Sequence, residues 1–185
     1  MPSLSEVERR TALELARRAV TEAVSHRSMP DQIPRDGVFA EQRGVFVTLH
    51  VAGRLHGCIG VIEAHEPLGD AIVRCAASAA LEDTRFAPLT AEQLGALGVE
   101  ISLLSPLVAI QPESIEIGRH GLFISYHAQR GLLLPQVAIE HHLTREEFLS
   151  ETCRKAGLRP EVWRESEAKL FGFTCEVFSD SSQHP

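Results

Sequence analysis

The sequence predicts an α+β fold, with a mainly antiparallel β-sheet and flanking helices. Several stretches alternate apolar with other residues and are joined in pairs by short turns, which is typical of β-hairpins. The helical stretches do not follow each strand in turn, so the regular βαβ pattern of a parallel sheet is absent. With 185 residues, of which 44% are hydrophobic, the chain is long enough for one compact domain over residues 1–185.

Three main helices are expected. Residues 5–25 place alanine and leucine at helical spacing, and Ser5 with Glu8 has the pattern of a capping box. A second helix is expected over residues 67–81, where the apolar residues recur on one side. The third helix, over residues 144–156, also begins with a capping-box pattern. We expect the helix near the N-terminus to pack on the rest of the domain.

The expected strands form two hairpins and two further strands. Residues 45–62 and residues 122–135 each contain two apolar stretches around a short turn. Residues 99–105 alternate, with Val99, Ile101 and Leu103 on one face, and residues 169–178 form a final strand that also alternates. The segment 26–43 contains prolines and is expected to be a long connector, a feature that is often functional.

Composition and charge argue against binding to nucleic acid, insertion into a membrane and secretion. The net charge is -7, and the basic residues are scattered, whereas a nucleic-acid backbone needs clustered Lys and Arg. No apolar run approaches the ~20 residues of a membrane span. The N-terminal residues lack the pattern of a signal peptide. We therefore expect a cytoplasmic protein that binds neither membranes nor nucleic acid.

Strand alternation divides the first hairpin into two faces. The odd-numbered residues of 45–51 and 55–61 are aliphatic or glycine and form the expected core face. The even-numbered residues then point to the opposite face. They are Phe46, Thr48, His50, His56, Cys58 and Gly60.

A three-residue turn at 52–54 aligns the core residues of the two arms. In that register His50 opposes His56, and Thr48 opposes Cys58. A slip by one residue would mix apolar and polar residues on each face. The sequence therefore predicts a thiol and two imidazoles on the sheet surface that faces away from the core.

Cys58 is the main candidate for chemistry, and three interpretations stay open. A thiolate is a nucleophile, and a neighbouring imidazole of His56 or His50 can lower the pKa of a thiol. Alternatively, these three side chains could bind a metal ion, although no fourth ligand is evident. In the third interpretation Cys58 only fills a small gap, which is common for cysteine. Gly57 and Gly60 would let a ligand approach the backbone closely.

Residues 55–60 read Leu-His-Gly-Cys-Ile-Gly. This segment resembles the Leu-Arg-Gly-Cys-Ile-Gly signature of the AMMECR domain family, whose bacterial and archaeal members are called AmmeMemoRadiSam system protein A. Further similar stretches cover residues 36–178; they are GVFVTLH, DTRFAPLT, VEISLLSPL, HGLFI, LLLPQV, FLSETCRKAGL and KLFGFTCEVF. His56 stands where the signature has arginine. Imidazole is smaller than guanidinium and titrates near neutrality.

The resemblance implies an α+β fold with a larger and a smaller lobe and a cleft between them. It also implies a modification pathway with two protein partners, a Memo-like protein and a radical S-adenosylmethionine enzyme. Two function classes stay open. In the first, the protein is a cysteine-dependent enzyme with Cys58, His56 and His50 as catalytic residues. In the second, it is a non-catalytic accessory module that binds a ligand or a protein through the same face.

Further residues are expected to bind a ligand. They flank Cys58 in the hairpin or lie in loops, where binding residues concentrate. They are Thr48, Gly57, Ile59, Gly60, Arg85, His120 and Gln136. The sequence has no Walker or dinucleotide-binding glycine motif, and we predict neither a cofactor nor a metal.

Overall fold

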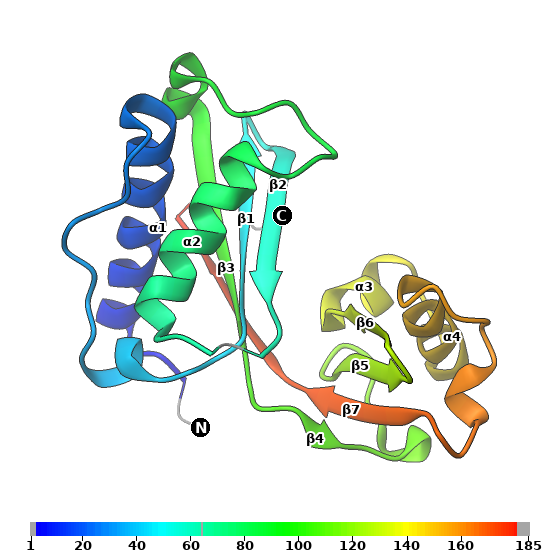
Figure 1. Cartoon of the computed structure of the whole chain (residues 1–185). Coiled ribbons are helices and arrows are strands. Elements are labelled where there is room, and N and C mark those ends of the chain that lie inside the picture. The colour runs from blue at the N-terminus through cyan, green and yellow to red at the C-terminus, as the bar shows by residue number, and fades with distance from the viewer. Residues whose placement is uncertain (1–2, 64, 181–185) are drawn as a thin grey trace. The chain divides into compact units, whose positions relative to one another are not determined.

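The computed structural model describes residues 3–63 and 65–180 (Figure 1). The described residues divide into a larger compact unit, 3–63 and 65–104 with 176–180, and a smaller one, 105–175. Each unit contains one four-stranded sheet, and flanking helices accompany both sheets. The predicted α+β class with mainly antiparallel pairing is confirmed.

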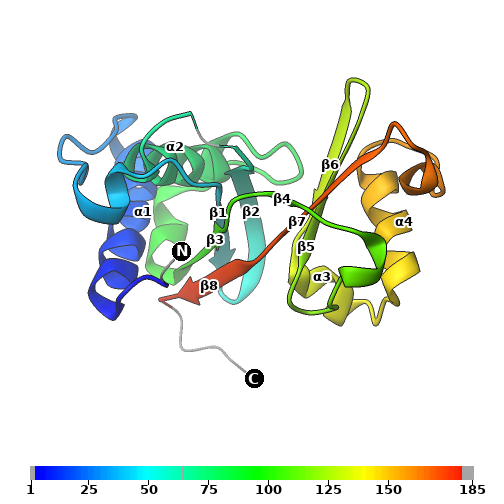
Figure 2. The ribbon, with the colours of Figure 1, turned by 90° about the horizontal axis from the view of Figure 1, so that it is seen from below.

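The larger unit holds the first sheet, with strand order β2-β1-β3-β8. Helices α1 and α2 accompany this sheet, as Figure 2 shows from below. Helix α1 begins at the predicted capping box, because the Glu8 backbone N–H donates to Ser5 Oγ at 3.3 Å. The elements are α1 (Glu6–His26), β1 (Val45–Val51), β2 (Arg54–Val61), α2 (Leu68–Leu81), β3 (Leu97–Leu104) and β8 (Cys175–Ser179), with short 3₁₀ helices at Gly37–Ala40 and Ala91–Ala96.

The core of the larger unit lies between the two helices and one face of the first sheet. Val45, Val47 and Leu49 of β1 have no exposed surface, and they pack in one cluster with residues of α1 and α2. The alanine-rich side of α2 lets the helix approach the sheet closely, as its buried alanines show. The predicted division of β1 into a core face and an opposite face is therefore confirmed.

The register of the first hairpin differs in part from the prediction. Thr48 does pair with Cys58, but His50 pairs with Leu55, because a β-bulge interrupts the ladder beside it. The turn has two residues, Ala52 and Gly53, both with positive φ, as in a type I′ turn. The predicted three-residue turn and the pairing of His50 with His56 are therefore wrong.

The bulge also changes which face Leu55 occupies. The expected core face included Leu55, but this side chain is 45% exposed and shares the face of His50. A bulge inserts one extra residue into a strand, so the alternation of faces changes on its far side. Strict alternation therefore holds for Gly57 onward and fails at the turn end of β2.

The smaller unit holds the second sheet, with strand order β4-β7-β5-β6. Its core contains Phe148 and Leu149 of α4, which pack against Leu122 of β5. The final strand predicted at 169–178 is two strands, interrupted at Thr174, and each half belongs to a different sheet. The elements are β4 (Val108–Ala109), β5 (Gly121–Tyr126), β6 (Gln129–Leu133), α3 (Pro135–Glu140), α4 (Arg145–Lys155) and β7 (Lys169–Phe173), with 3₁₀ turns at Pro112–Ser114 and Val162–Arg164.

Within residues 3–63 and 65–180, no helix is both long and apolar enough to cross a bilayer.

Candidate functional site

Cys58 lies on β2, an edge strand of the first sheet, and its side chain points away from the helix-covered face. The residue is half-buried. The hydroxyl of Thr48, on the neighbouring strand β1, donates a hydrogen bond to Cys58 Sγ at 3.3 Å. The predicted proximity of these two side chains is confirmed. We call this side of the sheet the Cys58 face; it carries Thr48, His50, Cys58, Gly98 and Glu100.

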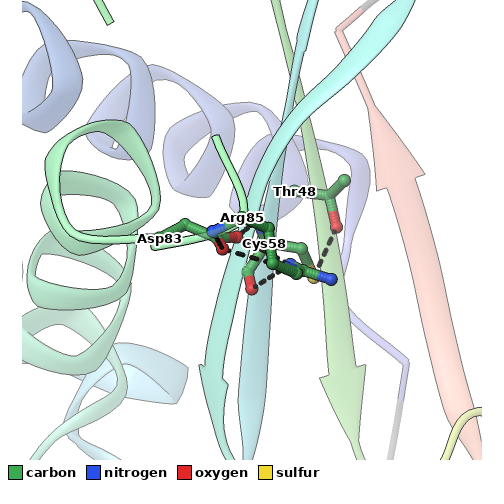
Figure 3. Close-up of polar contacts among 4 residues, drawn as sticks. All are labelled: Thr48, Cys58, Asp83 and Arg85. Carbon is green, nitrogen blue, oxygen red and sulfur yellow. Dashed lines mark hydrogen bonds and ion pairs between the residues drawn. The ribbon is translucent and has the colours of Figure 1, made fainter. Parts of the chain in front are cut away.

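The loop after α2 binds the backbone of Cys58 at the free edge of β2 (Figure 3). The Cys58 backbone N–H donates to Asp83 Oδ2 at 2.9 Å. Arg85 Nη2 donates to the Cys58 backbone oxygen at 3.2 Å. Together the acid and the base occupy the backbone groups that a neighbouring strand would otherwise use. The loop therefore fixes Cys58 and blocks strand addition at this position.

Asp83 and Arg85 form a two-point ion pair. Arg85 Nε donates to Asp83 Oδ1 at 2.9 Å, and Nη2 donates to Oδ2 at 2.6 Å. The Asp83 side chain is only 5% exposed, whereas that of Arg85 is 55% exposed. The hydrogen bond from Arg85, supported by the Cys58 backbone N–H, holds the pKa of the Asp83 carboxyl well below its usual range. Asp83 is therefore ionised in the folded protein at any physiological pH.

Arg85 brings positive charge to the backbone of Cys58, where its Nη2 donates to the carbonyl oxygen. Its pKa is raised mainly by the hydrogen bond to Asp83, and a thiolate at Cys58 contributes in the same direction. The guanidinium also lies over the ring of Phe86, with its carbon 5.4 Å from the ring centroid. Because Asp83 and the Phe86 ring both contact the guanidinium, its position is fixed and it does not sample many rotamers in solvent.

His56 is directed toward the same loop and not toward His50. Its ring stacks on Phe86, with centroids 6.1 Å apart and the planes inclined by 24°. Its Nε2 atom is buried and has no hydrogen-bond partner. In the described part of the chain, the side-chain hydrogen bond to Cys58 Sγ comes from Thr48, and neither imidazole makes one. The expected direct contact of an imidazole with the thiol is therefore not seen.

The two glycines of the signature have packing roles in this structure. A Cβ atom at Gly57 would lie 2.0 Å from the backbone oxygen of Ala79 on α2. A Cβ atom at Gly60 would lie 2.3 Å from the ring of Phe46. Helix α2 and the Phe46 ring thus occupy the space beside these glycines, and Ile59 packs against the core cluster. The predicted approach of a ligand to Gly57 and Gly60 stays a prediction; the close neighbours seen here belong to the protein itself.

The residues proposed as metal ligands do not form a metal site. His50 pairs with Leu55, and the ring of His56 stacks on Phe86. Across residues 3–63 and 65–180, no three His, Cys, Asp or Glu side chains are grouped so that they could hold a metal ion. The interpretation of His50, His56 and Cys58 as a metal site is therefore not supported.

A cavity of about 380 Å³ opens on the Cys58 face beside the hairpin turn. His50 of β1 and Glu100 of β3 line it, together with Gly98 and the turn residues Ala52 and Gly53. Cys58 does not line the cavity itself. The first sheet thus carries a thiol and a cavity on one face. Thr48 lies between Cys58 and the cavity-lining Glu100.

Comparison with known families agrees with this fold and signature. The AMMECR1 family model matches residues 13–178. The chain belongs to the AMMECR1 family. The resemblance found in the sequence is therefore confirmed over most of the chain.

Archaeal relatives align with this AMMECR1-family chain over nearly its whole length. A protein of Methanothermobacter thermautotrophicus is 41% identical, with 96% of each chain covered. Protein TK0174 of Thermococcus kodakarensis is 40% identical over 91% of this chain and 88% of the relative. The crystal structure of the uncharacterized protein PH0010 from Pyrococcus horikoshii superposes with a TM-score of 0.88 at 36% identity, covering 96% and 94% of the two chains.

Two predicted ligand-binding residues belong to the smaller unit of the AMMECR1-family fold. His120 Nδ1 accepts a hydrogen bond from the Glu116 backbone N–H at 3.0 Å, and the ring lines a cavity of about 190 Å³. Gln136 lies on α3, and its Oε1 atom is buried without a hydrogen-bond partner. Both residues therefore belong to the smaller unit, and their part in ligand binding stays a prediction.

Sequence reasoning missed two features of the site. It did not predict that Asp83, in the loop after α2, accepts a hydrogen bond from the Cys58 backbone. It also did not consider Glu100, which lies next to Thr48 in the β1–β3 pairing. The alternation of residues 99–105 placed Glu100 on the polar face, so this signal was present. The contact of Asp83 spans 25 positions in sequence and has no local signal.

Proposed function

We propose that this AMMECR1-family protein is a cysteine-dependent enzyme whose Cys58 accepts an acyl or similar electrophilic group. The observation that carries the proposal is the pair of groups beside the sulfur. Thr48 donates a hydrogen bond to Sγ, and the guanidinium of Arg85, fixed by Asp83, donates to the backbone oxygen of the same residue. Reactive cysteines are found beside cationic side chains, and their nucleophilic form is the thiolate.

In the proposed step, the Cys58 sulfur attacks an activated carbonyl carbon. A sulfur–carbon bond forms, and the leaving group departs with the electron pair of the bond that breaks. Arg85 is the candidate to stabilise negative charge that develops on the carbonyl oxygen, because its side chain is 55% exposed while Asp83 fixes the orientation of the guanidinium. His56 supports this arrangement through Phe86, which contacts both its ring and Arg85.

The proposed enzyme acts in the cytoplasm within a modification pathway. Its partners would be a Memo-like protein and a radical S-adenosylmethionine enzyme. Support for these partners comes from the ordered motifs that resemble the AMMECR domain family. Co-purification of the full chain with both proteins from its own cell is the expected result; repeated recovery of the chain without either would contradict the assignment.

A non-catalytic accessory module that binds through the same face is the second candidate. One observation favours it: among the described residues, no imidazole is hydrogen-bonded to Cys58 Sγ to act as a general base. In such a module, Thr48 and Arg85 would bind a ligand or a partner protein, and the thiol would be a packing residue. The two candidates differ in whether Cys58 forms a covalent bond.

Acyl transfer from p-nitrophenyl acetate separates the two candidates. We expect one acetyl group on Cys58 of the wild-type protein, located by peptide mass spectrometry, with release of one equivalent of p-nitrophenolate. The variant Cys58→Ser should lose this rapid phase, and the matched variant Cys153→Ser should keep it, because Cys153 is fully buried. Acetylation that is absent or spread over other residues would reject the enzyme in favour of the accessory module.

A further inference from the structure

The cavity on the Cys58 face has the size of a small-molecule site. Its volume of about 380 Å³ lies in the lower part of the range of ligand pockets, roughly 300 to 1,000 Å³. Gly98 contributes to the hollow, because it pairs with His50 and a side chain at this position would point toward the same face. The turn residues Ala52 and Gly53 form another wall. The cavity therefore results from small residues on β3 and in the hairpin turn.

Two polar side chains line this cavity without a partner. In the described part of the chain, the side chains of Glu100 and His50 make no hydrogen bond or ion pair with another residue. Glu100 is half-buried, so its carboxylate is less hydrated than it would be on a fully exposed surface. Arg17 of α1 is paired with Asp180 and with the backbone oxygen of Leu97. The carboxylate is thus available to a ligand.

We propose that this cavity binds the protonated amine of a small organic molecule, with Glu100 as the counterion. A charge-assisted hydrogen bond from an ammonium group to a carboxylate is among the stronger polar contacts. His50 adds a second polar group on the opposite strand, β1. Small and apolar residues around them would contact the hydrocarbon part of the ligand.

Three observations favour an organic amine over a metal ion or an anion. Glu100 and His50 are two ligands, and no third His, Cys, Asp or Glu side chain of the described residues joins them in a metal-binding group. The cavity is also much larger than an ion. An anion is disfavoured because Glu100 supplies a negative charge to the lining.

The amine site would lie at one end of the proposed reaction site. Thr48 pairs with Cys58 on one side and with Glu100 on the other, so the three side chains form a row across β2, β1 and β3. Neighbouring strands are about 4.8 Å apart, so Glu100 and Cys58 are separated by roughly 10 Å. A ligand with its amine at Glu100 would extend over Thr48 and place an electrophilic carbon near the sulfur. This placement of the electrophilic carbon near Cys58 rests on the proposed function.

Binding of the amine is tested without any reaction at Cys58. We expect n-butylammonium to cause saturable shifts in the backbone amide resonances of Gly53 and Gly98, and we expect neutral 1-pentanol to bind at least tenfold more weakly. The variant Glu100→Gln should lose the saturable shifts, and Cys58→Ser should keep them. The control Glu14→Gln should also keep them, because this exposed carboxylate is on α1, across the sheet from the cavity.

The outcomes distinguish the amine site from the proposed function. Equal binding of butylammonium and pentanol, or unchanged binding in Glu100→Gln, overturns the amine site whatever Cys58 does. If Glu100→Gln does not fold, Gly98→Ala replaces it, because its methyl group would enter the cavity and should weaken binding severalfold. Full retention of binding in a folded Gly98→Ala protein would then overturn the site.

The position of the amine relative to the thiol has its own test. N-(4-aminobutyl)bromoacetamide should alkylate wild-type Cys58 with saturation kinetics, and N-pentylbromoacetamide should not saturate. In Glu100→Gln the half-saturating concentration should rise at least fivefold while the maximal rate stays similar. A linear dependence on the concentration of the amine reagent, with butylammonium still bound in the spectra, would contradict only the link to Cys58.

Discussion

The two faces of the first sheet are held in place by different forces. On the helix-covered face, Val45, Val47 and Leu49 are fully buried, and hydrocarbon packing fixes them. On the Cys58 face, the position of the thiol depends on a few polar contacts from Thr48 and the 83–86 loop. This difference shows that burial of apolar side chains determines the fold, while a few hydrogen bonds determine where the Cys58 thiol lies. Changes on the two faces should therefore have different consequences.

The largest effect on stability is expected at Gly57, where the core face meets α2. In Gly57→Ala the new Cβ would lie 2.0 Å from the Ala79 oxygen, so helix and strand must separate. We expect a loss of about 3 kcal/mol in the free energy of unfolding, measured by urea denaturation. The matched variant Gly95→Ala, where nothing lies within 4 Å, should change it by less than about 0.5 kcal/mol. Similar effects at the two positions would contradict the close packing of α2 on Gly57.

A smaller effect is expected at Asp83, whose role is local to the Cys58 face. Asp83→Ala leaves the Cys58 backbone N–H and the Arg85 guanidinium without their acceptor. We expect a loss of about 2 kcal/mol in the free energy of unfolding. The control Asp70→Ala removes an ion pair with the largely exposed Arg35, and it should cost at most about 1 kcal/mol. If both variants lose the same stability, the loop does not hold β2 as described.

The smallest effect concerns the dependence of stability on pH. Asp83 has a lowered pKa in the folded protein, so its contribution is complete above the pKa of about 3.9 of an unfolded Asp and is lost as the pH falls below it. The unfolded chain then binds the proton first, and protonation favours unfolding. Between about pH 5 and pH 2, the free energy of unfolding should fall more steeply for wild type than for Asp83→Asn. Parallel curves would show that Asp83 is not held ionised by Arg85.

The sequence contained enough information for the faces of β1 and for the pairing of Thr48 with Cys58. Alternation of aliphatic residues determines that register, because a slip would expose the core residues. The bulge near His50 was not predictable in the same way, since Ala52-Gly53 is not among the strong sequence signals for a two-residue turn. Because of this bulge, His56 does not lie opposite His50; its ring stacks on Phe86 instead.

The remaining misses have a common physical origin. The ion pair of Asp83 and Arg85 is visible in sequence as two nearby charges, but its contact with Cys58 depends on how α2 crosses the sheet. The end of β7 at Thr174 likewise depends on the division of the chain into two units, whereas alternation alone continues to residue 178. Local patterns predict elements and faces; contacts between distant segments require the packed fold.

The reactivity of the four thiols toward iodoacetamide tests the central claim most directly. Cys75 is fully buried in the core, where burial raises the pKa of its thiol to about 11. Cys175 is half-buried like Cys58, so it controls for access to the reagent. At pH 7.5 we expect Cys58 to be alkylated at least about tenfold faster than Cys175 and about a hundredfold faster than Cys75, followed by peptide mass spectrometry. Modification of Cys58 at the rate of Cys175 or more slowly would contradict an activated thiol on this face.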